Sequence, residues 1–156
     1  IEHLERRNDH EAELVVIIGQ GGRNISRANA MRHVAAYTSG LDMTVRGPEE
    51  RSLRKSVDSY SVLGPWLVTA DEIPHPDQMD FSLHVNGELR QKANTRDLIL
   101  DIPHLIEFAS SFYTLRTGDL LYTGTPEGVA QVHPGDVITT SFAGIGDMTV
   151  VVRSSK

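Results

Sequence analysis

Apolar and polar residues follow the short periods of β-strands along most of this chain. Residues 11–18 begin with acidic side chains and end in the unbroken apolar run 14–18, which is typical of a strand buried on both faces. Residues 81–85 alternate between apolar and polar, and the Asn86-Gly87 pair behind them predicts a β-hairpin with residues 88–92. Similar patterns predict strands at 41–45, 66–69, 119–123, 137–142 and 148–152.

A helical period occurs in two places. Ser26 is a good N-cap for a helix of about three turns, whose apolar stripe runs from Met31 to Thr38. Asp101 is an N-cap for a second helix, whose stripe runs to Tyr113. Because strands outnumber helices and no βαβ rhythm is present, the predicted fold class is mixed α/β and predominantly β.

Two glutamates, Glu11 and Glu13, stand at the acidic end of the first predicted strand. Residues i and i+2 of a strand point to the same face, so both carboxylates face one point beside a buried backbone. Two like charges that leave water need a partner, and a divalent cation or an arginine cluster would supply one. We interpret the pair as a metal site. The alternative is that it forms only the solvated face of the strand.

Asp42 is the expected third ligand. It lies between Leu41 and Met43 in a short apolar segment, where a purely solvated role is harder to explain. Three carboxylates would offer the hard oxygen ligands that magnesium prefers. A zinc site is not expected, because the chain has no cysteine and its seven histidines are scattered without an H-x-x-x-H pair.

Positive charge gathers after Asp42, in the stretch 46–55. The stretch carries four cations and contains Gly47-Pro48, so we expect a mobile loop. On one interpretation it is simply a solvated charged loop. On the other, Lys55 reaches the metal site and binds a substrate carboxylate or a developing enolate oxygen as a point charge.

The segment Thr123–Gly128 follows an apolar strand and contains two glycines. Gly124 lets the backbone approach a ligand closely, and Thr125 adds a hydroxyl beside backbone N–H groups, which would suit an anion. The spacing is not that of a P-loop, and no lysine closes the segment. The same residues would also make an ordinary tight turn.

Composition narrows the classes of partner. A chain of 156 residues with 39% hydrophobic residues suits one compact domain. The formal net charge of −6 comes without acidic blocks, so neither nucleic acid nor a membrane surface is an expected partner. The absence of cysteine excludes disulfides and thiol nucleophiles, and no apolar stretch reaches membrane-spanning length. We therefore expect a soluble, cytoplasmic protein.

Eight segments of the chain together resemble the fumarylacetoacetate hydrolase family. In order, they are His10–Leu14, Leu41–Arg46, Arg54–Ser56, Leu63–Trp66, Val85–Glu88, Gln91–Thr95, Gly118-Asp119 and Thr123–Val129. The resemblance covers essentially the whole chain. It implies a mixed β-roll with a barrel-like sheet and two flanking helices, and a homodimer or a higher homo-oligomer.

The resemblance also assigns roles to single residues. Glu11, Glu13 and Asp42 would hold Mg²⁺, for which Mn²⁺ or Ca²⁺ would be substitutes. Lys55 would be the catalytic residue and would contact a small oxo-acid substrate near the metal, and Thr125 would hold a substrate carboxylate. The expected substrate-binding residues are Arg46, Lys55, Gly124 and Thr125.

Members of this family cleave, decarboxylate or isomerise 2-oxo or 1,3-dicarbonyl acids through an enolate, which a divalent ion and a nearby lysine would stabilise. The resemblance therefore implies a magnesium-dependent hydrolase that cleaves a carbon–carbon bond in a 2-oxo or 1,3-diketo acid. One alternative is an isomerase or decarboxylase of hydroxymuconate-type diacids in aromatic-compound catabolism. Another is a metal-binding or ligand-binding protein without catalysis.

The chain departs from the family pattern at two places. In hydrolytic members a histidine–glutamate pair upstream of the Glu-x-Glu strand activates water, but here His3 is followed by Arg6 where a glutamate is needed. We therefore expect residues 1–156 to form a single catalytic domain without the N-terminal lid segment. After Arg46, Gly47-Pro48-Glu49 replaces the Asp-x-Gln of many members, so the pattern does not identify the substrate.

Overall fold

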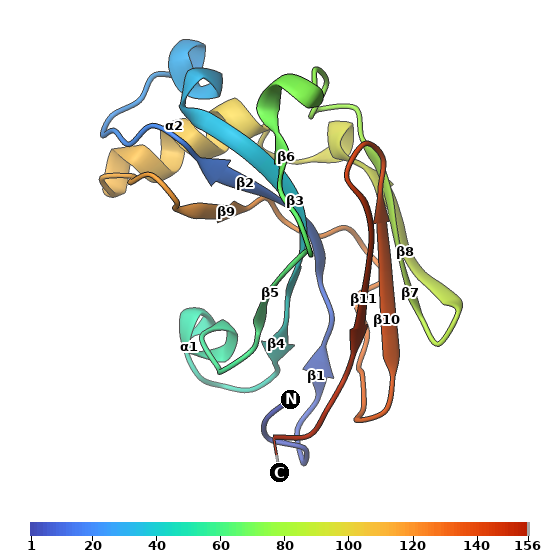
Figure 1. Cartoon of the computed structure of the whole chain (residues 1–156). Coiled ribbons are helices and arrows are strands. Elements are labelled where there is room, and N and C mark those ends of the chain that lie inside the picture. Colours follow the sequence, from blue (N-terminus) through green and yellow to red (C-terminus); the bar gives the residue numbers. More distant parts are fainter. Residues whose placement is uncertain (156) are drawn as a thin grey trace.

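The computed structural model describes residues 1–155, which form two large antiparallel sheets and one short two-stranded sheet (Figure 1). One large sheet has the order β5-β3-β2-β9 with β6 beside β3, and the other has the order β11-β10-β7-β8. The strands are β1 (Asn8–Asp9), β2 (Ala12–Ile18), β3 (Val34–Asp42), β4 (Thr44–Val45), β5 (Ser61–Leu63), β6 (Val68–Thr69), β7 (Asp80–Val85), β8 (Glu88–Asn94), β9 (Leu120–Tyr122), β10 (Val137–Phe142) and β11 (Gly146–Val151). The chain is thus predominantly β, as predicted.

The helices lie at the two ends of the molecule rather than between the sheets. The α-helices are α1 (Arg51–Lys55) and α2 (Ile102–Phe112), and the 3-10 helices are η1 (Arg27–His33), η2 (Ala70–Glu72) and η3 (Thr95–Asp97). Helix α2 packs with η1 at one end, whereas α1 lies beside β4 and β5 at the other (Figure 1). Within the described residues, neither α-helix has the length of apolar sequence needed to cross a bilayer.

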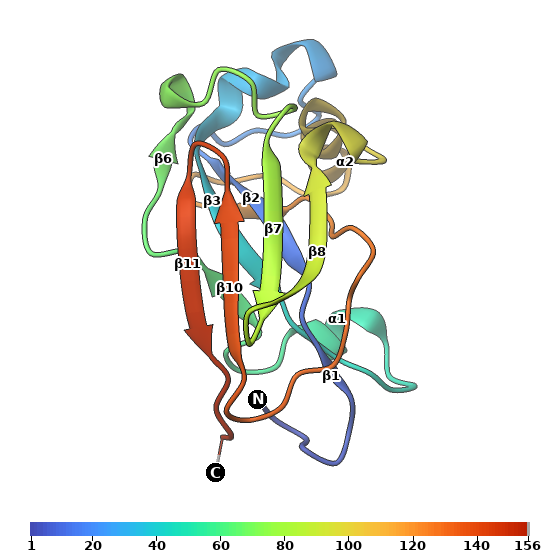
Figure 2. The same cartoon turned by 90° about the vertical axis from the view of Figure 1, so that its right-hand side faces the viewer.

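The hydrophobic core lies between the two large sheets, which Figure 2 shows one behind the other. Alternate residues of β2, from Ala12 through Leu14 and Val16 to Ile18, belong to this core together with Leu83 of β7. Because side chains of a strand alternate between its faces, the odd-numbered residues of β2 point away from the core. The continuous apolar run therefore predicts β2 correctly, and the one acidic residue of the strand, Glu13, lies on the opposite face.

The predicted hairpin and the second predicted helix are confirmed. Asn86 and Gly87 connect β7 to β8 with φ values of 52° and 81°, the left-handed pair that a tight two-residue hairpin turn requires. The Asp101 side chain accepts a hydrogen bond from the His104 N–H, 2.9 Å away, at the start of α2. Both features were readable from local sequence because each depends on residues close together in the chain.

The helix predicted from Ser26 to Thr38 is wrong. Only Arg27–His33 is helical, as a 3-10 turn, and residues 34–42 form the long strand β3. Strand β3 pairs with β2 on one side and with β5 and β6 on the other, so its backbone groups find partners across both edges. Val34, Tyr37 and Thr38 are β-branched or aromatic, and this preference together with sheet pairing outweighs the apparent helical stripe.

The loop predicted over residues 46–55 is also only partly correct. Its last five residues, Arg51–Lys55, form α1. The Glu50 carboxylate accepts a hydrogen bond from the Ser52 N–H at 2.7 Å and caps the helix. Arg6 anchors the preceding turn through two hydrogen bonds to the Glu49 carboxylate. Because the Arg6 contact spans more than forty positions, the sequence pattern could not reveal it.

Candidate metal centre

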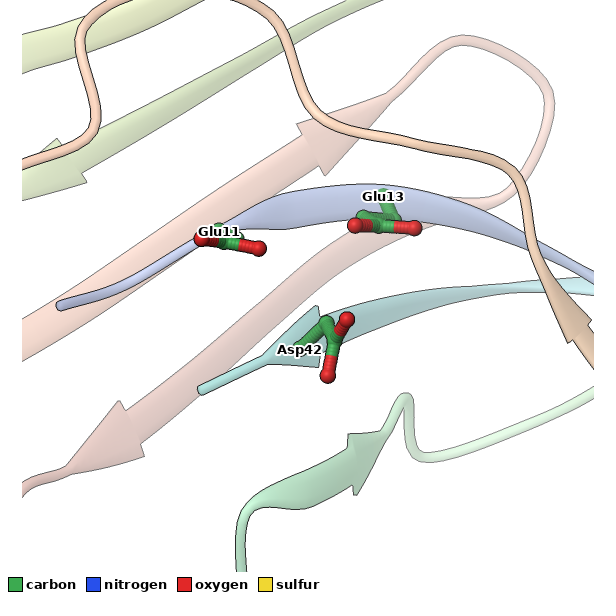
Figure 3. A group of neighbouring side chains, drawn as sticks. All are labelled: Glu11, Glu13 and Asp42. Carbon is green, nitrogen blue, oxygen red and sulfur yellow. The ribbon is translucent and has the colours of Figure 1, made fainter. Parts of the chain in front are cut away.

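Pairing between β2 and β3 brings Asp42 to the two glutamates. Glu13 lies opposite Gly40, and the Asp42 N–H donates to the Glu11 carbonyl at 2.9 Å. Glu11, Glu13 and Asp42 consequently share the sheet face that points away from the core. One carboxylate oxygen from each residue lies within 4.8 Å of the others, and Figure 3 shows the three side chains converging.

Gly40 allows the strands around the carboxylates to pack closely. A Cβ atom at this position would lie 2.5 Å from Val15 Cγ2 and 2.8 Å from Tyr122 Cε1. Both distances are shorter than real Cβ contacts, so even alanine would force β2, β3 or β9 to move. Glycine opposite Glu13 therefore helps fix the spacing between the glutamates and Asp42.

Helix α1 presents Lys55 to this cluster. Its Nζ atom lies 2.7 Å from Glu11 Oε2, 2.5 Å from Asp42 Oδ2 and 3.0 Å from Thr44 Oγ1. Burial opposes the charge of Lys55, but hydrogen bonds to Asp42 and Glu11 outweigh it and raise the pKa of the lysine. Lys55 therefore lies within hydrogen-bonding distance of two of the three acidic residues.

Arg46 contacts the cluster through Glu11, at the carboxylate oxygen that Lys55 does not bind. Its Nη2 lies 3.0 Å from Glu11 Oε1, and its Nε lies 2.7 Å from Asp9 Oδ2. The guanidinium thus pairs with two carboxylates of its own chain, whereas the sequence suggested a substrate-binding role. Arg46 orients Glu11 in this arrangement.

Asp9 is the member of this network that sequence reasoning missed. It is fully buried, and Arg7 Nε also contacts it at 2.7 Å. Burial would raise the pKa of Asp9, but hydrogen bonds from Arg7 and Arg46 outweigh it and lower that pKa. Asp9 precedes Glu11 by two residues, so extending the i, i+2 pattern by one step could have found it.

Glu13 is the most buried of the three carboxylates, with 4% of the residue exposed. The Gly124 N–H donates to its Oε2 at 2.6 Å, so the segment Thr123–Gly128 borders the cluster. Burial raises the pKa of Glu13 to about 7, although the Gly124 hydrogen bond opposes the shift. Gly124 has a φ of 105°, which suits glycine. Its N–H donates to a carboxylate of the protein itself, that of Glu13.

The donor chemistry of this cluster fits a hard divalent cation. The three carboxylates of the cluster carry three formal negative charges. Lys55 contributes one positive charge, and the positive charge of Arg46 is divided between Glu11 and Asp9. Burial raises the pKa of Asp42 even though Lys55 opposes the shift, so unbalanced negative charge is costly here. Carboxylate oxygens at this spacing could coordinate Mg²⁺ or Mn²⁺.

Thr125 lies next to the cluster, half-buried, and its Oγ1 accepts a hydrogen bond from Gln91 Nε2 at 2.8 Å. Gln91 is a buried residue to which sequence reasoning gave no role. His10 is turned toward Gln91 as well, with its Nδ1 3.1 Å from Gln91 Oε1. Neither contact has a local sequence signal, because Gln91 is 34 residues from Thr125 and 81 residues from His10 along the chain.

A cavity of about 550 Å³ adjoins the same segment. Gly124 and Thr125 line it, and its apolar wall includes Leu98, Ile99 and Leu105. The segment Thr123–Gly128 thus has Glu13 as one neighbour and a partly apolar cavity as another, an arrangement that suits a small organic ligand.

Comparison with known proteins gives consistent matches. The family model described as Fumarylacetoacetate (FAA) hydrolase C-terminal matches residues 2–153. A maleylpyruvate hydrolase of Aquipseudomonas alcaligenes is 58% identical over 154 residues, covering 99% of this chain and 54% of the relative. A 4-hydroxyphenylacetate degradation bifunctional isomerase/decarboxylase of Salmonella dublin is 43% identical over 142 residues, covering 88% of this chain and 33% of the relative.

A solved structure also matches almost the whole chain. The crystal structure of maleylpyruvate hydrolase from Sphingobium sp. SYK-6, in complex with manganese(II) and pyruvate, superposes with a TM-score of 0.93 at 44% sequence identity. The match covers 99% of this chain and 58% of that protein. The chain therefore spans between a third and about three fifths of the length of these relatives.

Proposed function

The chain belongs to the fumarylacetoacetate hydrolase family, and from this premise we propose that it forms the metal-binding catalytic domain of a hydrolase that cleaves a carbon–carbon bond in a 2-oxo or 1,3-diketo acid. The observation that carries the proposal is the convergence of Glu11, Glu13 and Asp42 on one sheet face, with Lys55 beside them. The maleylpyruvate hydrolase relatives support an acylpyruvate as the class of substrate.

The proposed metal is Mg²⁺, with Mn²⁺ or Ca²⁺ as substitutes, held by Glu11, Glu13 and Asp42. When bound, such an ion supplies Lewis acidity toward the oxygens of a 2-oxo acid. The Mn²⁺ and pyruvate in the crystal structure of the Sphingobium enzyme support a divalent ion and a 2-oxo acid as ligands of this chain.

Lys55 and Thr125 are the proposed substrate contacts. The ammonium of Lys55 is fixed by Glu11 and Asp42, so it can stabilise negative charge that develops on an enolate oxygen without reorganising. The Thr125 hydroxyl donates to a substrate carboxylate, and the Gly124 N–H holds Glu13 in place. Arg46, in this proposal, acts through Glu11 rather than on substrate.

We also propose that the protein forms a homodimer or a higher homo-oligomer. Exposed aromatic residues on and after α2 support this, because exposed apolar patches mark interaction surfaces. They are Phe108, Phe112 and Tyr113, each more than half exposed. Analytical ultracentrifugation would detect the assembly, and a purely monomeric protein at micromolar concentration would contradict it.

Turnover assays test the proposed activity. The full-length protein should release pyruvate from an acylpyruvate such as maleylpyruvate with Mg²⁺ or Mn²⁺ present and should stop when EDTA is added. The Glu13→Ala variant should lose metal binding and activity but keep its fold, as checked by circular dichroism. Turnover unaffected by EDTA would contradict the metal role.

The same assays separate the alternatives. The Salmonella dublin relative makes an isomerase or decarboxylase the second candidate, and conversion of a hydroxymuconate diacid or oxaloacetate without acylpyruvate cleavage would favour it. Metal and pyruvate binding without any turnover would favour a binding protein.

A further inference from the structure

The side-chain amide of Gln91 connects the metal-bearing strand to the loop that carries Thr125. Gln91 belongs to β8 in the opposite sheet and is 1% exposed. Its Oε1 lies 3.1 Å from the Ala12 N–H nitrogen, and its Nε2 lies 2.8 Å from Thr125 Oγ1 and 3.0 Å from the Pro126 carbonyl oxygen. Ala12 stands between Glu11 and Glu13, so one amide holds both halves of the site.

Two backbone groups fix which way this amide points. The Ala12 N–H can only donate, so the atom facing it must be the amide oxygen. The Pro126 carbonyl can only accept, so the atom facing it must be the NH₂ group. In a reversed amide, the NH₂ group would face the Ala12 N–H and the oxygen would face the Pro126 carbonyl. Neither pair can form a hydrogen bond, and leaving these buried groups unpaired is costly. The orientation of Gln91 therefore follows from its neighbours.

This orientation gives Thr125 a defined role in hydrogen bonding. Since Gln91 donates to Thr125 Oγ1, the threonine oxygen is an acceptor in that bond, and its own hydrogen is left to donate elsewhere. Within residues 1–155, the Thr125 hydroxyl donates to no protein acceptor. A carboxylate oxygen, which can only accept, is the complementary group.

The loop itself is held at a fixed distance from Gln91. A Cβ atom at Gly128 would lie 2.0 Å from the Arg90 carbonyl oxygen, so only glycine permits this approach of the loop to β8. The His10 N–H, two residues before Ala12, donates to the Ala130 carbonyl at 3.2 Å and ties the same loop to the segment that carries Glu11. The Gln91 hydrogen bonds are thus supported by the backbone on both sides.

We propose that Gln91 is a positioning residue with two effects. By donating to Thr125 Oγ1, it directs the hydroxyl hydrogen of Thr125 toward the carboxylate of a 2-oxo acid. It also sets the distance between this hydroxyl and the metal ligands. The inference rests on the proposed function, because it requires that such a substrate binds beside Thr125. Gln91 touches neither substrate nor metal and acts only through Thr125 and Ala12.

A double-mutant cycle tests this inference, with calorimetric titration of pyruvate into Mn²⁺-loaded protein as the readout. Thr125→Val should weaken pyruvate binding about tenfold to a hundredfold, as expected for losing a hydrogen bond to a charged group, and Gln91→Met should weaken it about tenfold. In the Thr125→Val background, Gln91→Met should cause no further loss, because the hydroxyl that it orients is gone. Thr125→Ser, which keeps the hydroxyl, should retain the sensitivity to Gln91→Met.

Equal losses from Gln91→Met with and without the Thr125 hydroxyl would overturn the inference, since Gln91 would then act only as a packing residue. Mn²⁺ titration without pyruvate, run on every variant, separates this failure from that of the proposed function. Failure of the unsubstituted protein to bind Mn²⁺ would contradict the proposed function itself. Binding of both Mn²⁺ and pyruvate with an additive cycle would contradict the role of Gln91 alone.

Gln91→Glu provides a second variant in case the methionine variant does not fold. A carboxylate keeps the shape of Gln91 and still accepts from the Ala12 N–H, but it accepts from the Thr125 hydroxyl instead of donating to it. Pyruvate binding should fall about tenfold or more while Mn²⁺ binding persists. Native-like affinity for pyruvate in the folded Gln91→Glu protein would overturn the inference.

Discussion

Lys55 balances the negative charge of the acidic cluster and, in the proposed reaction, contacts the substrate. Its ammonium contacts Glu11 and Asp42, two of the three residues proposed to hold a dication. The lysine therefore repels the metal while it attracts an anionic substrate. Because these effects are opposite, an experiment can distinguish the role of Lys55 from that of the metal ligands.

We predict that Lys55→Met raises the affinity for Mn²⁺ about tenfold, because a competing cation is removed, while kcat falls by about 10²–10³ because the enolate loses a charged donor. Calorimetry would measure the first effect and pyruvate release the second. Lys92→Met, which removes an exposed lysine from β8, is the matched control and should change neither quantity. Parallel losses of Mn²⁺ affinity and kcat in the Lys55 variant would refute the separation.

The pKa of Glu13 predicts how metal binding depends on pH. Burial raises the pKa of this carboxyl from 4.5 to about 7, so folding favours its protonated form. Its contribution to stability is therefore complete below about pH 4.5 and is lost as the pH rises through about 7. A dication needs the ionised form, so metal affinity must change in the opposite direction.

We expect the affinity for Mn²⁺ to rise about tenfold per pH unit below pH 7 and to level off above it. Titrations between pH 5.5 and 8.0, in buffers of different ionisation enthalpy, would show the proton released on binding. An affinity that does not vary over this range would exclude Glu13 as a titrating ligand.

At the scale of the elements, the central strands β2 and β3 determine the geometry of the site. Strand β2 was predictable because its apolar run is continuous, whereas β3 was not, since its Met31–Thr38 stripe also suits a helix. Only pairing with β2, β5 and β6, which lie elsewhere in the chain, selects the strand. The position of Asp42 opposite Glu11 depends on that pairing.

We predict that Gly40→Ala lowers the free energy of unfolding by about 1–3 kcal/mol, because its Cβ would overlap Val15 and Tyr122. The metal affinity should fall as well, since β3 carries Asp42. Urea denaturation of the metal-free protein would measure the first effect. Ser61→Ala on the exposed face of β5 is the control and should stay within about 0.5 kcal/mol of the native protein. If the Gly40 variant were as stable as the native protein, the strands could shift to accommodate the Cβ atom without a loss of folding free energy, which would contradict this prediction.

At the scale of the whole molecule, the sequence predicts the class of fold and the three acidic residues, but not the network that holds them. Glu11 and Glu13 follow from strand periodicity, and Asp42 from an acid in an apolar segment. Arg46 and Gln91 act through contacts between distant segments, and no local pattern encodes such contacts, whereas Asp9 continues the i, i+2 pattern of the two glutamates. What the sequence left open is therefore the relative placement of the two sheets and of α1.

The central claim is that Glu11, Glu13 and Asp42 together bind one divalent cation. Anomalous diffraction at the manganese edge, from a crystal of the protein grown with Mn²⁺ and pyruvate, tests it most directly. We predict a single peak at coordination distance, about 2 Å, from one oxygen of each of these three residues. A peak elsewhere, or no peak between β2 and the end of β3, would contradict the account.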